Sequence, residues 1–395
     1  MGKLNDVVIL AGARTPIGDF GGQFRQLLAN ELAIVAVQEA MKRADILPEE
    51  VEEVILGNCI QRTDEPNLGR TVALKAGMPK ETTGFTIQRQ CSSGMQAVVS
   101  GWQEIALGDA EIVVAGGAES MSNALYVLKD ARWGQRLTHG EFTDSLWELL
   151  TDPLHNILMG VTAENLAEKY AISREEQDTV ALRSHKNASR ASKDGTFAEE
   201  IVPVPVPAKR GEVKLVDSDE HIRSDLTMEK LASLSAAFKK GGTVTAGNAS
   251  GLNDGATAMV LMNEKRAAQK NVQPLGRIVS YAWAGVEPEL MGYGPVPATQ
   301  IALQKAGLTL ADIDLFEVNE AFAAQYLACE KLLGLNRDIV NVNGSGVGLG
   351  HPVGSTGARI MLTLLYELRR RQKRYGLATL CVGGGMGMAV IVERI

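Results

Sequence analysis

The chain has 395 residues, of which 45% are hydrophobic and 22% charged, so it can bury a sizeable core in more than one domain. Its formal net charge of −7 excludes the broad basic face of a nucleic-acid-binding protein. No apolar run approaches the ~20 residues of a membrane span, and the first apolar run begins at Val7, which leaves no room for an export signal. We therefore expect a cytoplasmic protein that binds neither nucleic acid nor membrane.

Runs of β-branched residues alternate with helical patterns from the start of the chain. Strands and helices are predicted in turn at 7–10, 32–44, 54–56, 94–107 and 112–114. This alternation is typical of an α/β chain whose strands are buried on both faces. The same pattern returns near the C-terminus, at 313–318, 357–371 and 377–382.

Two pairs of segments resemble each other. Residues 44–52 and 306–314 have the same order of helix end, turn and acidic residue, and an apolar strand follows each. Residues 112–117 likewise resemble 379–384. Self-similarity of this kind indicates a duplicated fold.

The region between these halves, residues 122–243, is more charged. Its Val-Pro repeat at 202–207 cannot form a central strand, because proline lacks the N–H that a sheet requires. Ser173 and Glu176 have the spacing of a capping box, which predicts a helix that Gly195 ends. We expect an ordered, loop-rich insertion.

Cys91 follows a strand-like stretch at 85–87 and precedes apolar residues at helical spacing that end before Gly108. It is therefore predicted at a helix start. Exposed N–H groups and the helix dipole there lower the pKa of a thiol toward the nucleophilic thiolate. A packed structural thiol is the alternative, and these residues alone leave it open.

His351 lies within a glycine-rich stretch, residues 341–354, before a helix predicted from Ser355. A histidine in a loop over a helix N-terminus is well placed to act as a general base. A phosphate-binding loop is the rival interpretation, but the stretch satisfies neither the P-loop nor the dinucleotide-binding motif.

The other cysteines show no paired spacing, so neither a zinc site nor a disulfide framework is expected. Cys59 and Cys329 are interpreted as small buried hydrophobic residues. Cys381 ends a predicted strand, where α/β sites gather, although a core thiol is the alternative. Asn319 also ends a strand and could orient a water or a carbonyl, or cap a helix.

Several blocks of the sequence together resemble the thiolase family. The signature blocks, in the family's order, are at 90–94, 319–323, 350–352 and 381–385, and further matching blocks are at 13–16, 115–121 and 243–255. The resemblance therefore runs from end to end. Several long motifs in one order are far more specific than any one of them.

The resemblance implies an α/β thiolase-like fold. Two duplicated βαβαβαββ halves would form a five-layered α-β-α-β-α core with an inserted loop domain, and most members are homodimers or homotetramers. On this basis we predict an N-terminal half at 1–121, an inserted CoA-binding loop domain at 122–243, completion of the N-terminal half at 244–272, and a C-terminal half at 273–395.

The resemblance also implies an acyl-CoA C-acyltransferase of fatty acid metabolism, which cleaves 3-ketoacyl-CoA with CoA or runs the reverse Claisen condensation. Cys91 would carry the acyl group as a thioester, His351 would take its proton, and Cys381 would exchange the proton at the acetyl carbon. Asn319, through a water, and His351 would polarise the enolate oxygen, and the N–H groups of Cys91 and Gly383 would receive the second oxyanion. The chemistry needs no metal and no tightly bound cofactor, since CoA is a substrate.

The CoA contacts of the family correspond here to Arg223, Ser250 and Phe238, with Leu158 and Met159 near the pantetheine. Many short-chain biosynthetic members carry a histidine where this chain has Leu158. An apolar wall at that position favours a range of short or medium acyl chains.

Three other functions are considered. A ketoacyl synthase-like condensing enzyme would share the fold, but such enzymes lack a second cysteine such as Cys381. A noncatalytic acyl-CoA-binding or lipid-binding member is disfavoured because all four catalytic positions are filled. A cysteine hydrolase could use the same Cys91 and His351, and only the product distinguishes it.

Overall fold

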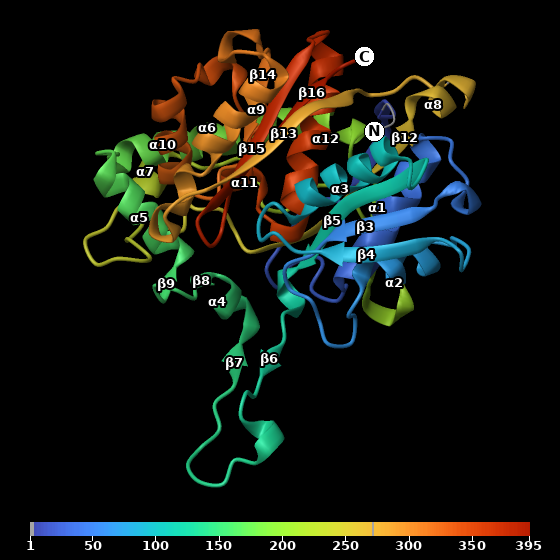
Figure 1. Cartoon of the computed structure of the whole chain (residues 1–395). Coiled ribbons are helices and arrows are strands. Elements are labelled where there is room, and N and C mark those ends of the chain that lie inside the picture. Colours follow the sequence, from blue (N-terminus) through green and yellow to red (C-terminus); the bar gives the residue numbers. More distant parts are fainter. Residues whose placement is uncertain (1–3, 271) are drawn as a thin grey trace.

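Two open sheets of similar design form the centre of the molecule in a computed structural model that describes residues 4–270 and 272–395 (Figure 1). The strands of the first sheet are β1 (Val7–Arg14), β2 (Gly18–Asp19), β3 (Glu53–Gly57), β4 (Thr83–Ile87), β5 (Ile112–Ser120) and β12 (Asn253–Asn263). Those of the second sheet are β13 (Arg277–Gly285), β14 (Leu315–Val318), β15 (Tyr375–Val382) and β16 (Met386–Glu393). The strand orders are β1-β12-β5-β3-β4 and β13-β16-β15-β14.

The two sheets repeat one pairing pattern. In each, a central strand (β5 or β15) pairs in parallel with one neighbour (β3 or β14) and antiparallel with the other (β12 or β16). The next strand is also antiparallel and is bulged at the same step, between Ile9 and Ala11 in β1 and between Ile278 and Ser280 in β13. A bulge is a specific feature of a strand pair. The duplication predicted from the sequence is confirmed.

Helices form three layers around these sheets. The helices on the outer face of the first sheet are α1 (Ala29–Arg43) and α2 (Leu68–Lys75). Between the sheets lie α3 (Ser93–Leu107) and α12 (Val353–Arg371), and the outer face of the second sheet is covered by α9 (Pro295–Ala306) and α10 (Ala323–Leu333). The predicted five-layered α-β-α-β-α core is therefore confirmed, with α12 visible between the sheets in Figure 1.

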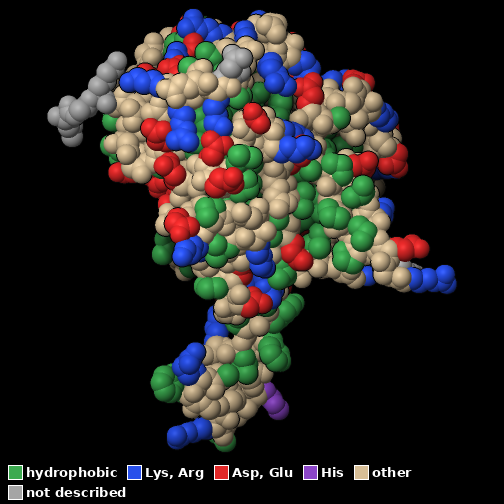
Figure 2. All heavy atoms as spheres, turned by 90° about the vertical axis from the view of Figure 1, so that its right-hand side faces the viewer, with side chains coloured by type: hydrophobic (Ala, Val, Ile, Leu, Met, Phe, Trp, Pro, Cys, Tyr) green, Lys and Arg blue, Asp and Glu red, His purple; other side chains and the backbone are tan. Residues whose placement is uncertain are grey.

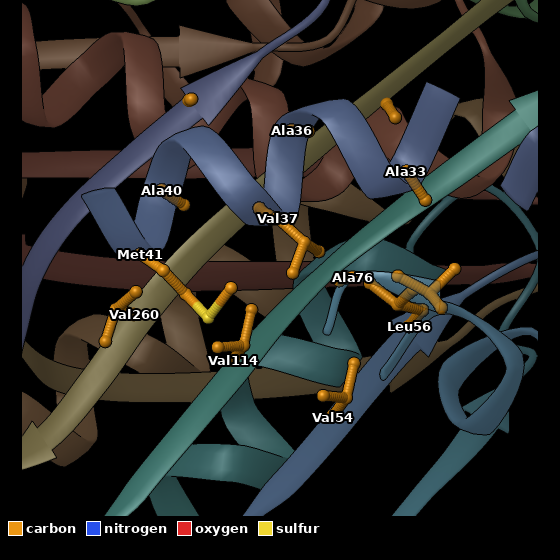
Figure 3. Close-up of a cluster of buried hydrophobic side chains, with 14 of the residues drawn as sticks. Ala33, Ala36, Val37, Ala40, Met41, Val54, Leu56, Ala76, Val114 and Val260 are labelled. Carbon is orange, nitrogen blue, oxygen red and sulfur yellow. The ribbon is translucent and has the colours of Figure 1, made fainter. Parts of the chain in front are cut away.

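Small residues let the outer helix α1 approach the first sheet closely. Ala33, Ala36 and Ala40 recur at helical spacing, and their face of α1 turns toward Val114 and Val260 (Figure 3). A stripe of buried residues with the period of a helix is what fixes an amphipathic helix on a sheet. The predicted helix start at 32 was late by three residues, since α1 begins at Ala29.

The two helices of the central layer touch through glycines. A Cβ added to Gly357 of α12 would lie 2.6 Å from the backbone nitrogen of Met95 in α3, and one added to Gly94 would lie 2.8 Å from the carbonyl oxygen of Gly354. Real Cβ atoms do not approach backbone this closely. The N-terminal turns of α3 and α12 are therefore side by side only because both carry glycine there.

Residues 121–252, between β5 and β12, supply no strand to either large sheet among the residues described. Their helices are α4 (Ser145–Leu149), α5 (Met159–Lys169), α6 (Arg174–Lys193) and α7 (Met228–Ala232), and their strand pairs are β6 (Tyr126–Val127) with β7 (Thr143–Asp144), β8 (Thr151–Asp152) with β9 (Ile157–Leu158), and β10 (Val204–Pro207) with β11 (Val213–Val216). The short helices α8 (Glu264–Lys270) and α11 (Gly346–Leu349) lie outside this segment.

The capping box at Ser173 is confirmed, because its hydroxyl accepts from Glu176 N at 3.2 Å and the Glu176 carboxylate accepts from Ser173 N at 2.7 Å.

The β6–β7 hairpin extends from the body as an arm, residues 122–145 (Figures 1 and 2). Large apolar side chains are exposed on it, with Trp133 and Leu137 both 84% exposed. Of the helices described, none combines the length and the apolar composition that a bilayer span needs.

We predict that Gly357→Ala lowers the free energy of unfolding by about 1–3 kcal/mol, because the added methyl group overpacks the contact between α12 and α3. Gly285→Ala is the matched control, since a Cβ there meets its nearest atom at 4.0 Å. Urea unfolding followed by circular dichroism measures both variants. Equal midpoints for the two variants would contradict the role given to the helix contact.

Candidate active site

The candidate residues lie where the first turns of α3 and α12 meet the carboxyl ends of the parallel strands β14 and β15. Cys91 directly precedes the cap of α3, and His351 precedes the cap of α12. Asn319 follows β14, and Cys381 lies near the end of β15. The carboxyl ends of parallel strands and the N-termini of helices are where α/β proteins place their chemistry.

A strained turn presents Cys91. Gln90, the residue before it, has φ of 45°, in the left-handed region that a side chain with a Cβ rarely adopts. The turn is closed by N–H donation from Ser92 to Arg89 O and from Ser93 to Gln90 O, both at 3.0 Å. Such strain persists only where the surroundings determine the conformation, and it commonly marks a functional site.

Burial sets the protonation of Cys91. Desolvation raises its pKa to about 11, although the backbone N–H groups of Gly383 and of Cys91 itself hydrogen-bond the sulfur and oppose the shift. The expectation that the helix N-terminus lowers this pKa is therefore wrong for the ligand-free site. Cys91 therefore rests as a thiol, and a reaction through its sulfur would need a base to take the proton.

His351 has the features of such a base. The Thr356 hydroxyl donates to Pro352 O at 2.9 Å, so it accepts from Nδ1 of His351 at 2.7 Å. The proton is thus on Nδ1, and Nε2 carries a lone pair that has no hydrogen-bond partner among the residues described. Burial, with the charge of Arg359 as a lesser cause, lowers the pKa of His351 to about 3, so the imidazole is neutral at physiological pH.

Asn319 and Asn58 follow the corresponding strands β14 and β3, but their amides have different partners. Each directly follows the strand that pairs in parallel with the central strand of its sheet. Asn58 donates from Nδ2 to Ala118 O at 3.0 Å and to Glu119 Oε1 at 2.8 Å. Neither polar atom of the Asn319 side chain has a partner within the described ranges, although the residue is fully buried. Asn319 does not cap a helix either, because α10 begins four residues later. Its amide is left for a ligand or a water.

Cys381 is a second buried thiol near the nucleophile. Burial raises its pKa well above the ordinary value, and Cys91 adds to the shift, which brings the two sulfurs into one environment. The shift is large because the end of the strand lies in the interior, where Cys381 has no exposed surface. Both thiols are protonated at rest, while Gly383 places its N–H at Cys91.

Three of the five residues assigned to CoA contacts lie close to this cluster. Met159 Sδ is 3.7 Å from where a Cβ on Gly383 would lie. The Phe238 ring packs edge-on against Phe322 at 6.0 Å between centroids, next to the Asn319 block. Ser250 N donates to Ala321 O of that block at 2.9 Å.

The other two residues are placed less directly. Leu158 is half-buried and forms the N-cap of α5, immediately before Met159. Arg223 is exposed in the insertion, and its backbone N–H donates to Nδ1 of the buried His185 at 3.2 Å. The structure brings Met159, Phe238 and Ser250 to the cluster and leaves the Arg223 side chain at the surface.

A cavity of about 490 Å³ opens beside the cluster. Its walls include Arg89, Gln90, Leu149, Met159, Trp283, Gly383 and Met386. The sequence reasoning assigned no role to Trp283, since a single tryptophan in β13 carries no motif. In the described part of the chain, no group of three or more His, Cys, Asp or Glu side chains could hold a metal ion.

The sequence reasoning also missed Glu119, which is fully buried in β5 and accepts four hydrogen bonds beside the cluster. The sequence contained a signal for this role. Glu119 directly follows the apolar run 112–118, and a carboxylate buried at the end of such a strand must be paired.

Comparisons with known proteins agree over the whole chain. The models of the thiolase N-terminal domain and C-terminal domain match residues 7–265 and 272–394. The beta-ketothiolase BktB of Cupriavidus necator is 50% identical over 394 residues, and the alignment covers 99% of each chain. The acetyl-CoA acetyltransferase of Rhizobium meliloti is 50% identical over 390 residues, covering 98% of this chain and 99% of the relative.

Solved structures are similar as well. The acetyl-CoA acetyltransferase of Bacillus anthracis has a TM-score of 0.99 at 57% identity and covers 100% of both chains. Human mitochondrial 3-ketoacyl-CoA thiolase in complex with CoA has a TM-score of 0.95 at 46% identity, and the match covers 100% of this chain and 99% of that one.

We predict that the alkylation of Cys91 by iodoacetamide accelerates with pH by about tenfold per unit through neutral pH and does not level off below pH 9. The reason is that a thiol with a pKa of about 11 is protonated over this range, so its reactive thiolate fraction rises with pH. Mass spectrometry of the Cys91 peptide after timed quenching gives the rate. A plateau near pH 7 would instead indicate a resting thiolate beside a charged His351.

Proposed function

The chain belongs to the thiolase family, and from that premise we propose that it is an acyl-CoA C-acyltransferase that cleaves 3-ketoacyl-CoA with CoA, or condenses two acyl-CoA molecules, through an acyl thioester on Cys91. The observation that carries the proposal is the unpartnered Nε2 lone pair of the neutral His351. A thiolase must move protons between sulfur, nitrogen and carbon in one site, and this base lies in a cluster with two protonated thiols.

In the first half-reaction, Cys91 attacks the C3 carbonyl of the 3-ketoacyl thioester and its proton passes to Nε2 of His351. The N–H groups of Cys91 and Gly383, which hydrogen-bond the resting sulfur, are in position to receive the oxyanion that forms beside it. The bond between C2 and C3 then breaks, and its electron pair leaves as the enolate of acetyl-CoA.

The enolate is stabilised by Asn319 and His351. The Asn319 amide has no partner in the described residues and is free to polarise the thioester oxygen, directly or through a water. His351, now protonated at Nε2, donates to the same oxygen. Cys381 gives its proton to the enolate carbon and releases acetyl-CoA. A thiol with a raised pKa is a competent acid toward so basic a carbon.

The second half-reaction returns the acyl group to CoA. The thiol of a new CoA loses its proton to Cys381 and attacks the Cys91 thioester, again within reach of the N–H groups of Cys91 and Gly383. Acyl-CoA leaves with the Cys91 thiolate as the leaving group, and the proton held on Nε2 of His351 returns to Cys91, which restores the thiol and the neutral imidazole. CoA is thus a substrate, and no tightly bound cofactor takes part.

The CoA molecule is proposed to contact Arg223, Ser250 and Phe238, with its pantetheine past Leu158 and Met159. Burial of an apolar arm against Met159 and Phe238 is consistent with their half-buried side chains. The cavity of about 490 Å³, walled in part by Leu149 and Met386, supports acyl chains longer than the acetoacetyl group.

A homodimer or homotetramer is proposed on two features of the surface. Strand β4 is an edge of the first sheet, where backbone groups are open to pairing. The arm exposes Trp133 and Leu137, an apolar surface that a subunit contact would cover. A cytoplasmic location and a role in fatty acid metabolism stay predictions.

A ketoacyl synthase-like reaction is the second candidate, but the placement of Cys381 beside Cys91 favours a proton carrier over decarboxylation. A cysteine hydrolase is separated from a thiolase by its product alone.

The purified protein is predicted to convert acetoacetyl-CoA and CoA to acetyl-CoA, and Cys91→Ser is predicted to lower the rate at least about 1,000-fold, because a serine hydroxyl is a far weaker nucleophile beside the same base. Loss of absorbance of the acetoacetyl-CoA enolate follows the reaction. Cys329→Ala is the control, since Cys329 is a buried thiol to which no step of the reaction is assigned. Hydrolysis that proceeds without CoA would contradict the proposal.

Cys381→Ala is predicted to acquire an acetyl group on Cys91 from acetyl-CoA yet to lose exchange of acetyl hydrogens with deuterated water by about 100-fold or more, because the acid and base at that carbon is gone. Mass spectrometry of the Cys91 peptide and of released acetyl-CoA gives both readouts. Exchange at the wild-type rate would remove the role assigned to Cys381.

A further inference from the structure

Glu119 binds four N–H groups with one buried carboxylate. Its Oε1 accepts from Asn58 Nδ2 at 2.8 Å and from Ile60 N at 3.1 Å. Its Oε2 accepts from Cys59 N at 3.0 Å and from Gly354 N at 2.9 Å. All four partners are donors, so the hydrogen bonds favour the ionised carboxylate, while burial opposes ionisation and raises the pKa of Glu119 to about 7.

These donors come from both halves of the molecule. Asn58, Cys59 and Ile60 form the loop after β3 in the first half, whereas Gly354 is the second residue of α12 in the other half. A Cβ on Gly354 would lie 2.8 Å from Glu119 Oε2, so only glycine brings this N–H to the carboxylate. Glu119 therefore ties the start of α12 to the loop after β3.

On the first side, the link continues to the nucleophile. The Cys59 thiol donates to Gln90 O at 3.0 Å, and the Ser93 hydroxyl donates to the same oxygen at 2.6 Å. A trans peptide is planar, so its N–H points opposite to its C=O. By holding the Gln90 carbonyl, these two donors fix the direction of the Cys91 N–H, one of the two groups that hydrogen-bond the sulfur.

On the other side, the link continues to the base. Pro352 O accepts from Ser355 N at 2.9 Å and from the Thr356 hydroxyl at 2.9 Å, and that hydroxyl holds Nδ1 of His351. The imidazole is thus fixed to the first turn of α12, the turn that Glu119 anchors through Gly354.

We propose that Glu119 is a positioning residue, and this proposal rests on the proposed function. Glu119 holds the Cys91 N–H and the His351 imidazole at the distance and in the relative orientation that acyl transfer requires. Its charge does not serve to activate the thiol, since a neighbouring carboxylate makes a thiolate harder to form. A carboxylate is retained because it alone accepts four N–H donors from two loops at once. A glutamine would present an NH₂ group to two of these donors.

The test is Glu119→Gln. For thiolysis of acetoacetyl-CoA we expect kcat to fall about 10- to 100-fold, as misplacement of catalytic groups by a fraction of an ångström does. The KM for CoA stays within about twofold, because the CoA contacts lie elsewhere. Glu393→Gln is the matched control, since Glu393 is a buried carboxylate that accepts from Arg277 Nε at 2.9 Å and lies at the far end of β16.

Iodoacetamide alkylation separates positioning from unfolding. With the negative charge removed, Cys91 of Glu119→Gln should react no more slowly than in the wild type, while turnover falls. Cys329 should stay unmodified, because it is buried in the folded chain. A kcat unchanged as in Glu393→Gln, or a loss of turnover that is matched by modification of Cys329, would overturn the proposal.

If Glu119→Gln does not fold, the double variant Cys59→Val and Ser93→Ala removes the two side-chain donors to the Gln90 carbonyl and leaves Glu119, with its four N–H donors, in place. A fall in kcat at constant KM for CoA supports the proposal, and an unchanged kcat overturns it. A wild-type protein that does not consume acetoacetyl-CoA would refute the proposed function instead. The alkylation comparison needs no turnover and would still test whether Glu119 determines the surroundings of Cys91.

Discussion

The contact between α3 and α12 is the constraint on which the rest of the molecule depends. Both sheets bury a face in the central layer, and these helices must fill it together. Their first turns meet at Gly94, Gly354 and Gly357, where a side chain would strike backbone within 3 Å. The requirement for close packing therefore brings two helix N-termini, and the residues just before them, into one dry place.

Burial determines the protonation states of Cys91 and His351 more strongly than the helix dipoles do. Burial raises the pKa of Cys91 to about 11 and lowers that of His351 to about 3, so both groups rest in their neutral forms. A helix N-terminus stabilises an anion by roughly a kilocalorie per mole near the surface, whereas removing a charge from water costs several. In the proposed mechanism, a proton moves from thiol to imidazole only when an acyl group is present to take the electron pair. The resting site is thereby protected from random alkylation and oxidation.

Local patterns predicted much of this arrangement, but not its electrostatics. The repeat of 44–52 at 306–314 indicated the duplicated sheets, and the blocks at Cys91 and His351 indicated the site. The pKa of Cys91 was predicted with the wrong sign because burial depends on α12, which is distant in the sequence. The sequence did not predict the role of Glu119 for the same reason, since the partners of Glu119 come from two loops that only the fold brings together.

The ends of β3 and β14 each carry a buried asparagine, and the two side chains differ in their hydrogen bonding. Asn58 and Asn319 each follow the strand that pairs in parallel with the central strand of its sheet. Asn58 donates to Ala118 and Glu119, whereas Asn319 has no partner among the residues described. A buried amide without hydrogen-bond partners lowers the stability of the folded protein by about 1–3 kcal/mol or more. A protein retains such a group where a ligand or a water forms the missing hydrogen bonds. The Asn58 network includes Glu119, which anchors the turns of both Cys91 and His351, so the stability of the first half supports the unsatisfied amide of the second.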